Sequence, residues 1–257
     1  MANTLKPKDI LESTTPIMGE FILDCSGEDL DFGECKFLEH NFTVKDSQNL
    51  GKLTFNGFRG FIEFEECHIR EIVLDEEVDS IAERKAPFKI EKCGIEGVRI
   101  KSRIDGNLEM KGCRFTGITD FSNSKIERLN LSESNFDYTR IIDAEIGELN
   151  LETCRFVQLF DLTGTKVGSI NMSKAIILET FVLPEIDRAD LGECLDFTDL
   201  SINGKVSLTM PIGKVFENKF IQSFDKSSSS SEFLALRQIF ESNRRYSAAD
   251  TAYIYQK

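Results

Sequence analysis

The sequence predicts a mainly β protein that winds as a four-sided parallel β-helix and ends in a helical hairpin. Three observations indicate this architecture. Large apolar residues recur every five residues in the middle of the chain, and the units group into coils of about 20 residues. Near residue 225 this pattern stops, and an apolar spacing typical of amphipathic helices replaces it.

The five-residue repeat is clearest between residues 121 and 177. Its large apolar members form a predicted core ladder: Phe121, Ile126, Leu131, Phe136, Ile141, Ile146, Leu151, Phe156, Leu162, Val167, Met172 and Ile177. Two residues before each member stands a second, usually small residue, and the residue between them is usually polar. Because positions i and i−2 of an extended segment share one face, each unit is predicted to be a very short strand followed by a turn.

Four such faces make a coil of about 20 residues, and two further series support this length. The bulky residues Leu108, Leu129, Leu149 and Ile170 follow one another at 20 or 21 residues. A small-residue ladder has the same spacings: Cys93, Cys113, Ser134, Cys154 and Ala175. We therefore predict a solenoid in which each coil packs on its neighbours, with about 4.8 Å between coils.

Units such as Thr119-Asp-Phe121, Ser134-Asn-Phe136 and Cys154-Arg-Phe156 resemble pentapeptide repeats, in which a small residue is followed by Asp or Asn and then Leu or Phe. The resemblance is strong over residues 104–180 and looser before them. It implies a right-handed, four-sided parallel β-helix and a bacterial protein that interacts with other proteins.

The pattern divides the chain into four parts. We expect an N-terminal cap or arm at 1–20, the β-helix at 21–224 with irregular coils before about 104, a Ser-rich linker at 225–231 and a helical hairpin at 232–257. Residues 75–87 are the expected loop excursion, and the last coils are expected to reach about residue 220.

The hairpin is predicted from apolar spacing and from its start signals. Its first helix presents Phe233, Leu236, Ile239 and Phe240, and its second begins at Ser247, which forms a capping-box-like pair with Asp250. One interpretation is a cap over the last coil. In the other, the hairpin resembles the helical connector between pentapeptide repeats and membrane segments in channel-like proteins. The candidate interaction or connector residues are Phe233, Leu236, Phe240, Tyr246, Asp250 and Tyr253.

Composition argues against several classes of function. With 31 basic and 44 acidic residues the formal charge is −13, which disfavours direct binding of nucleic acid. There are two histidines: His68 is expected on the surface and His40 in a turn. Five of the seven cysteines occupy the inward small-residue position, so we expect reduced thiols, no metal site and no cofactor. Reduced thiols indicate a cytoplasmic location, which includes the cytoplasmic face of the inner membrane.

Three functions remain open. The favoured one is a non-enzymatic interaction or scaffold domain, the cytosolic soluble part of a larger bacterial protein, for which a channel-like membrane protein is one candidate. It would bind a protein partner or self-associate, and a missing C-terminal region would tether it. The second is an acidic DNA mimic acting on a type II topoisomerase. The third is a glycan-active enzyme using the acid pairs Asp143/Glu145 and Glu148/Glu152; mixed charges on the predicted faces make it least favoured.

Overall fold

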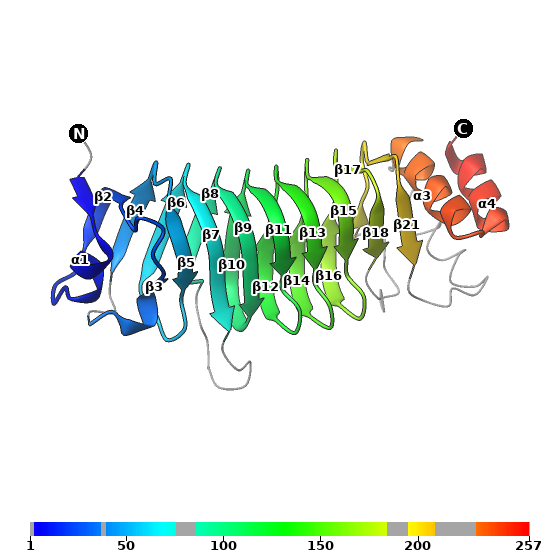
Figure 1. Cartoon of the computed structure of the whole chain (residues 1–257). Helices are drawn as coiled ribbons and strands as arrows, with labels where there is room; N and C mark the ends of the chain where they lie inside the picture. The colour runs from blue at the N-terminus through cyan, green and yellow to red at the C-terminus, as the bar shows by residue number, and fades with distance from the viewer. Residues whose placement is uncertain (1–2, 37–39, 76–85, 184–194, 209–229, 257) are drawn as a thin grey trace.

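The computed structural model describes residues 3–36, 40–75, 86–183, 195–208 and 230–256. The chain forms an elongated solenoid of parallel strands, with two helices packed at its C-terminal end (Figure 1). This confirms the mainly β, parallel solenoid fold and the C-terminal hairpin. The expected excursion at 75–87 lies almost wholly outside the described residues, as does most of the Ser-rich linker.

Two parallel sheets run the length of the solenoid. The first contains, in spatial order, β1 (Asn3–Leu5), β2 (Met18–Leu23), β4 (Asn41–Lys45), β6 (Phe61–Glu65), β8 (Phe88–Glu91), β10 (Arg103–Lys111), β12 (Lys125–Asn130), β14 (Glu145–Asn150), β16 (Lys166–Asn171) and β19 (Leu195–Asp196). The second contains β3 (Leu30–Asp31), β5 (Leu50–Thr54), β7 (His68–Asp75), β9 (Gly94–Lys101), β11 (Arg114–Asp120), β13 (Asn135–Arg140), β15 (Arg155–Asp161), β17 (Ile176–Ile177) and β20 (Ser201–Ile202). Beside them, β18 (Thr180–Leu183) pairs with β15 and β21 (Lys205–Leu208).

Like residues stack in register from coil to coil. Leu129 pairs with Leu149, as the 20-residue spacing predicts, and Leu149 pairs with Ile170. Phe136 stacks between two other rings, 4.7 Å from Phe115 and 5.8 Å from Phe156 between centroids. Every member of the core ladder is buried except Val167, which is partly buried against the core.

The turns differ from the prediction. They follow every second five-residue unit, because each strand runs across two units. In β12 the buried residues are Ile126 and Leu129, separated by the exposed Glu127 and Arg128. In a straight strand, buried and exposed residues alternate one by one. Two exposed residues in succession therefore indicate that the strand bends at its middle. A turn is not needed there, and two sheets bent in this way supply the four predicted faces.

The turns between strands share one backbone geometry. One residue in each turn has a left-handed backbone conformation, with φ of 59° at Asn123, 61° at Glu133 and 58° at Thr153. The residue before the turn caps it: Asp120 Oδ1 accepts a hydrogen bond from the N–H of Ser122, at 2.9 Å. This local bond explains why Asp or Asn recurs at alternate outward positions.

The segment expected as an N-terminal cap or arm contains β1, α1 (Pro7–Leu11) and the start of β2. Strand β1 already pairs with β2 in the first sheet, and Ile10 of α1 is fully buried in the core. Nearby, η1 (Phe32–Glu34) is a single 3₁₀ turn. At the other end lie α3 (Ser230–Ser242) and α4 (Tyr246–Gln256). Helix α3 therefore begins two residues before the predicted start of the hairpin at residue 232.

Candidate interaction surfaces

Helix α3 closes the C-terminal end of the solenoid. It contacts β20 and β21, and Phe233, Leu236 and Phe240 are buried. Helix α4 packs on α3 through alanines, because Ala248, Ala249 and Ala252 are the buried residues of its described part. Three of the candidate connector residues thus belong to the core of this end.

The side chain of Asn243, just after α3, pairs with the backbone of β21. Its Oδ1 accepts a hydrogen bond from the N–H of Leu208 at 3.1 Å, and its Nδ2 donates to the carbonyl of Val206 at 2.7 Å. An amide side chain therefore bonds the strand as a further strand would. No local sequence pattern marks this longer-range role of Asn243.

The hairpin turn also corrects the predicted start of the second helix. Helix α4 begins at Tyr246, and the carbonyl of Arg245 accepts the first hydrogen bonds, from Ala248 and Ala249. Ser247 therefore lies inside the helix and is not its N-cap. The left-handed residue of the turn is Arg244, with φ of 59°. The N–H groups of Arg244 and Arg245 donate hydrogen bonds to the carbonyls of Glu241 and Phe240, so this turn ends α3 directly before α4 begins.

The outer face of α4 carries large exposed apolar side chains. Tyr246 is 64% exposed and Ile254 70%, and Tyr253 is also exposed, as is Leu234 on α3. The guanidinium of Arg237 lies over the ring of Tyr253, 4.9 Å from its centroid. Asp250, also exposed, lies between Tyr246 and Ile254 along the helix. The remaining candidate connector residues, Tyr246, Asp250 and Tyr253, thus share a surface at the end of the molecule.

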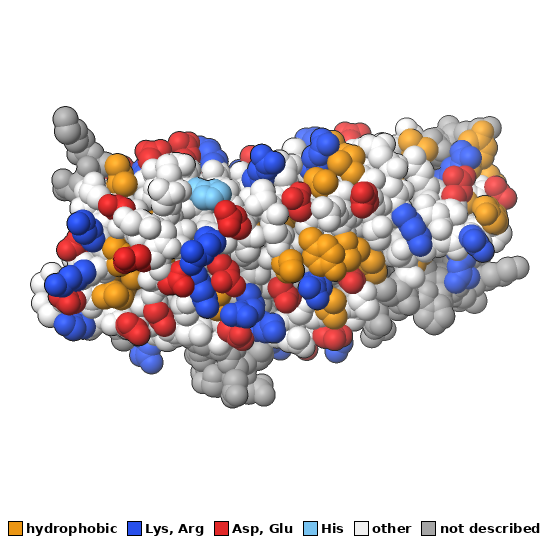
Figure 2. Space-filling view, in the orientation of Figure 1, with side chains coloured by type: hydrophobic (Ala, Val, Ile, Leu, Met, Phe, Trp, Pro, Cys, Tyr) orange, Lys and Arg blue, Asp and Glu red, His pale blue; other side chains and the backbone are white. Residues whose placement is uncertain are grey.

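A second exposed apolar patch lies on the flank of the solenoid, over β11, β13 and β15 (Figure 2). It consists of Ile118, Tyr138 and Leu159, which pair with one another across the three strands. Ile118 is 51% exposed, and the guanidinium of Arg140 lies 5.3 Å from the Tyr138 ring centroid. A hollow of about 320 Å³ adjoins the patch. Sequence reasoning missed this patch, although these residues interrupt a row of otherwise polar outward positions.

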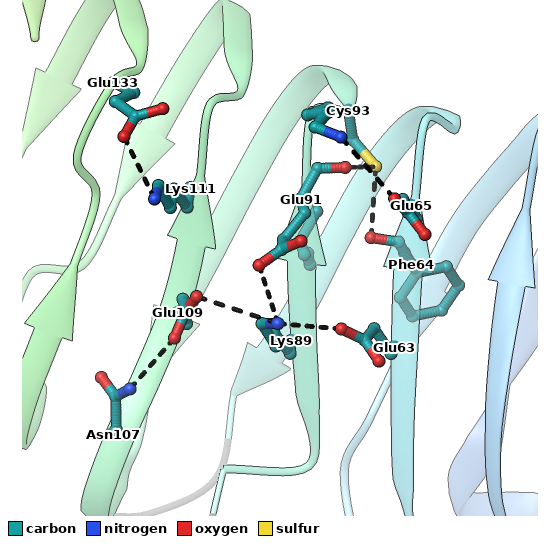
Figure 3. A network of polar contacts seen from close by, with 12 residues as sticks. Glu63, Phe64, Glu65, Lys89, Glu91, Cys93, Asn107, Glu109, Lys111 and Glu133 are labelled. Atoms are coloured by element: carbon teal, nitrogen blue, oxygen red, sulfur yellow. Dashed lines mark hydrogen bonds and ion pairs between the residues drawn. The ribbon is translucent and has the colours of Figure 1, made fainter.

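Elsewhere the outer faces carry acids with lysines between them. Lys89 contacts Glu91 at 2.7 Å, Glu63 at 2.9 Å and Glu109 at 4.0 Å, from three neighbouring strands (Figure 3). The hydrogen bonds with Glu91 and Glu63 raise the pKa of Lys89. Lys45 lies in the same way between Glu20 and Glu65, 3.0 Å from each. These contacts divide the acidic surface of the described coils into short stretches.

Of the four acids considered for catalysis, Glu145 lines a mixed-charge hollow of about 650 Å³ over β12, β14 and β16, whereas Asp143, Glu148 and Glu152 are not among its lining residues. There Glu145 forms an ion pair with Lys125 at 2.7 Å, and this hydrogen bond lowers the pKa of the Glu145 carboxyl. Glu152 contacts Lys174 at 3.9 Å. A general acid needs a raised pKa, so Glu145 is poorly suited to that role.

The six described cysteines are free and buried. Burial raises the pKa of Cys113 and Cys154 to about 12, so both thiols are protonated at neutral pH. Cys154 Sγ donates a hydrogen bond to the Leu131 carbonyl of the preceding coil, at 3.0 Å. The whole small-residue ladder is buried: Cys93, Cys113, Ser134, Cys154 and Ala175.

The two histidines have different environments. His68 is exposed, as expected, with Nε2 3.1 Å from a Glu96 carboxylate oxygen. His40 was expected in a turn but is buried, and its Nδ1 accepts a hydrogen bond from the N–H of Ile17 at 3.1 Å. It joins two segments far apart in sequence, a contact that the local pattern does not encode. The described residues contain no group of three or more His, Cys, Asp or Glu side chains placed to hold a metal ion.

No helix among the described residues is long and apolar enough to cross a membrane. The chain matches no family model, no curated protein and no solved structure with which it was compared.

Proposed function

We propose that this chain is a non-enzymatic interaction domain, in which a rigid solenoid holds a C-terminal hairpin ready for a protein partner. The observation that carries the proposal is the outer face of α4. Tyr246 and Ile254 are largely exposed there, whereas the opposite face of the helix is fixed to α3 through alanines. Large exposed apolar side chains that gather on one element are typical of interaction sites.

The finer form of the proposal rests on resemblance. The repeat units resemble pentapeptide repeats, and the hairpin resembles the connector that joins such repeats to membrane segments in channel-like proteins. We propose that the chain is the cytoplasmic part of a larger bacterial protein and that the outer face of α4 packs against the helical segment that leads to the membrane. The anchoring of α3 by Asn243 supports this role, since a connector must be held firmly to the domain it joins.

The alternative of an acidic DNA mimic has less support. A mimic needs a nearly continuous row of negative charge, as in duplex DNA. Lys45 and Lys89 lie between the acids of neighbouring coils, and residues 104–177 carry 8 basic residues against 11 acidic ones. Catalysis also has less support, because Glu145 is held ionised by Lys125.

Fractionation of native host cells tests the proposal, with an antibody raised against this domain. The expected result is a band well above 29.1 kDa in the membrane pellet. A carbonate wash separates an integral protein, which stays in the pellet, from a peripheral one, which is released. A 29.1 kDa band confined to the soluble fraction would overturn the proposed membrane role. A supercoiling assay with purified type II topoisomerase, in which we expect no inhibition, tests the mimic separately.

A further inference from the structure

The apolar patch on the flank, formed by Ile118, Tyr138 and Leu159, is part of two parallel rows of residues. The rows cross four neighbouring strands of the second sheet. The apolar row contains Ile118, Tyr138 and Leu159 and is extended by Gly97 on β9, which stands level with Ile118. The charged row lies two residues further along each strand. Its members, paired in register, are Arg99, Asp120, Arg140 and Asp161.

The charged row alternates in sign, so that its order reads positive, negative, positive, negative. Reversed, the same row reads negative, positive, negative, positive. A second copy placed face to face and antiparallel therefore presents an opposite charge to every member of the row. Such self-complementarity is the requirement for a two-fold symmetric interface, in which both subunits use the same surface.

We infer that this flank binds a second copy of the chain, with the two solenoids antiparallel. The two-fold axis runs along the strand direction, between β11 and β13. It places Arg140 against Asp120 of the second copy and Arg99 against Asp161 of the second copy. The same rotation places Ile118 against Tyr138 of the second copy and Leu159 against the position of Gly97.

The two arginines of the charged row differ in their contacts within the chain. Arg99 Nε lies 3.7 Å from the Asp75 carboxylate, so its charge is already partly balanced. Arg140 forms no ion pair in the described part of the chain, and its guanidinium contacts the Tyr138 ring. Asp120 and Asp161 each use Oδ1 to cap their own turn, which leaves Oδ2 for a partner.

Gly97 provides room for the opposing leucine. A Cβ at this position would lie 3.5 Å from the nearest atom, in the side chain of Glu71, and its backbone is not left-handed. A larger residue therefore fits the monomer, and the glycine is not required by the fold. In the proposed dimer the missing side chain leaves a recess opposite Leu159. A leucine facing this recess would give the two apolar rows complementary shapes.

Charge also favours this face over others. Each chain carries a formal charge of −13, so two copies repel each other unless their contact is locally balanced. The charged row contains two arginines and two aspartates, whereas the surface around Lys89 carries three acids against one lysine. The four strands span only about 14 Å along the solenoid, which predicts a weak, concentration-dependent dimer.

The decisive experiment uses two charge-reversal variants and their mixture. Asp120→Arg alone brings two arginines together at each contact, and Arg140→Asp alone brings two aspartates together. Sedimentation velocity over a concentration series should show a wild-type dimer and, for each variant, self-association weakened about tenfold or more. An equimolar mixture of the two variants should regain the dimer, because every contact between unlike chains is then a pair of opposite charges.

Controls separate this interface from loss of folding and from other interfaces. Circular dichroism melts show whether Asp120→Arg, which removes a turn cap, still folds. Gly97→Leu is the independent variant, expected to leave the melting temperature unchanged and to weaken the dimer. Arg128→Asp, on the opposite sheet, should not affect it. A wild type that stays monomeric throughout, a mixture of folded variants that stays monomeric, or a dimer abolished only by Ile254→Ser on α4 would overturn the inference.

Discussion

The Asn243 side chain accepts a hydrogen bond from the backbone N–H of Leu208 at 3.1 Å and thereby joins the hairpin to β21, the last described strand of the solenoid. The same amide also donates to the carbonyl of Ile239 in its own helix, at 2.7 Å. One side chain thus links the end of α3 with the backbone of β21, where a further coil would otherwise pair.

Replacement of this amide tests the link. Asn243→Ala should lower the free energy of unfolding by about 1–3 kcal/mol, because hydrogen bonds to the backbone of β21 are lost. Amide hydrogen exchange at Leu208 should accelerate more than exchange in β13. Ser242→Ala, one residue earlier, removes only a bond within the helix and is the matched control. Equal effects of the two changes would contradict the role given to Asn243.

The stacked phenylalanines make the core sensitive to truncation. Phe136 is buried between Phe115 and Phe156, so Phe136→Ala should cost about 3–5 kcal/mol in urea unfolding. Glu148, exposed at the bend of β14, should be replaceable by alanine with almost no loss. If Glu148→Ala were the damaging change, the register of the coils would be wrong.

The left-handed turn residues predict a stabilising substitution. Thr153 is β-branched and has φ of +58°, a conformation that costs an L-residue about 1–2 kcal/mol. Glycine removes this cost but loses about 0.5–1 kcal/mol through the entropy of the unfolded chain. Thr153→Gly should therefore raise the midpoint of thermal unfolding slightly.

Gly164 occupies the same position in the next turn, half a coil later, and serves as the opposite control. Its φ is +68°, and an added Cβ would meet the Asp143 carboxylate at 2.1 Å. Gly164→Ala should lower the same midpoint. A fall with Thr153→Gly would show that its side chain contributes more than the backbone strain costs.

His40 predicts a pH dependence of stability. Burial lowers the pKa of His40, opposed by the Ile10 carbonyl, and its Nδ1 must be unprotonated to accept the N–H of Ile17. The unfolded chain takes up a proton on this ring near pH 6.5. The stabilisation is therefore complete above that pH and declines as the pH falls below it.

Urea unfolding at pH 7.5 and pH 5.5 measures this decline. The wild type should lose stability between the two values, whereas His40→Gln, which cannot titrate, should show a smaller loss despite being less stable at pH 7.5. His68→Gln, on the surface, should retain the wild-type pH dependence. A His40→Gln protein with an unchanged dependence would assign the effect to other groups.

The sequence predicted the solenoid best where the inward residues are regular. Leu129, Leu149 and Ile170 pair as their spacing requires, because parallel in-register stacking places like residues at a fixed interval. The turns were misplaced because the bend within each strand preserves the five-residue spacing of the inward residues. Only the alternate Asp or Asn positions, such as Asp120, distinguish the turns from the bends.

The candidate surfaces were predicted less fully. Tyr246, Asp250 and Tyr253 were selected through a resemblance, and their exposure comes from the structure. Ile118 and Tyr138 lie 20 residues apart, so their contact follows from coil stacking. Their one sequence signal is that they are apolar in a row of otherwise polar outward positions, and such positions tolerate most residue types. His40 and Asn243 act across long sequence separations, and such contacts follow only from the completed fold.

Register between neighbouring coils has a consequence for how the molecule changes length. Because Leu129, Leu149 and Ile170 contact only adjacent coils, duplication of a segment from one turn to the equivalent turn 20 residues later would add a coil without re-pairing the others. Each such event would move α3 about 4.8 Å further from α1. The solenoid is thus a spacer that can lengthen in fixed steps, and the number of its coils sets the distance between its two ends.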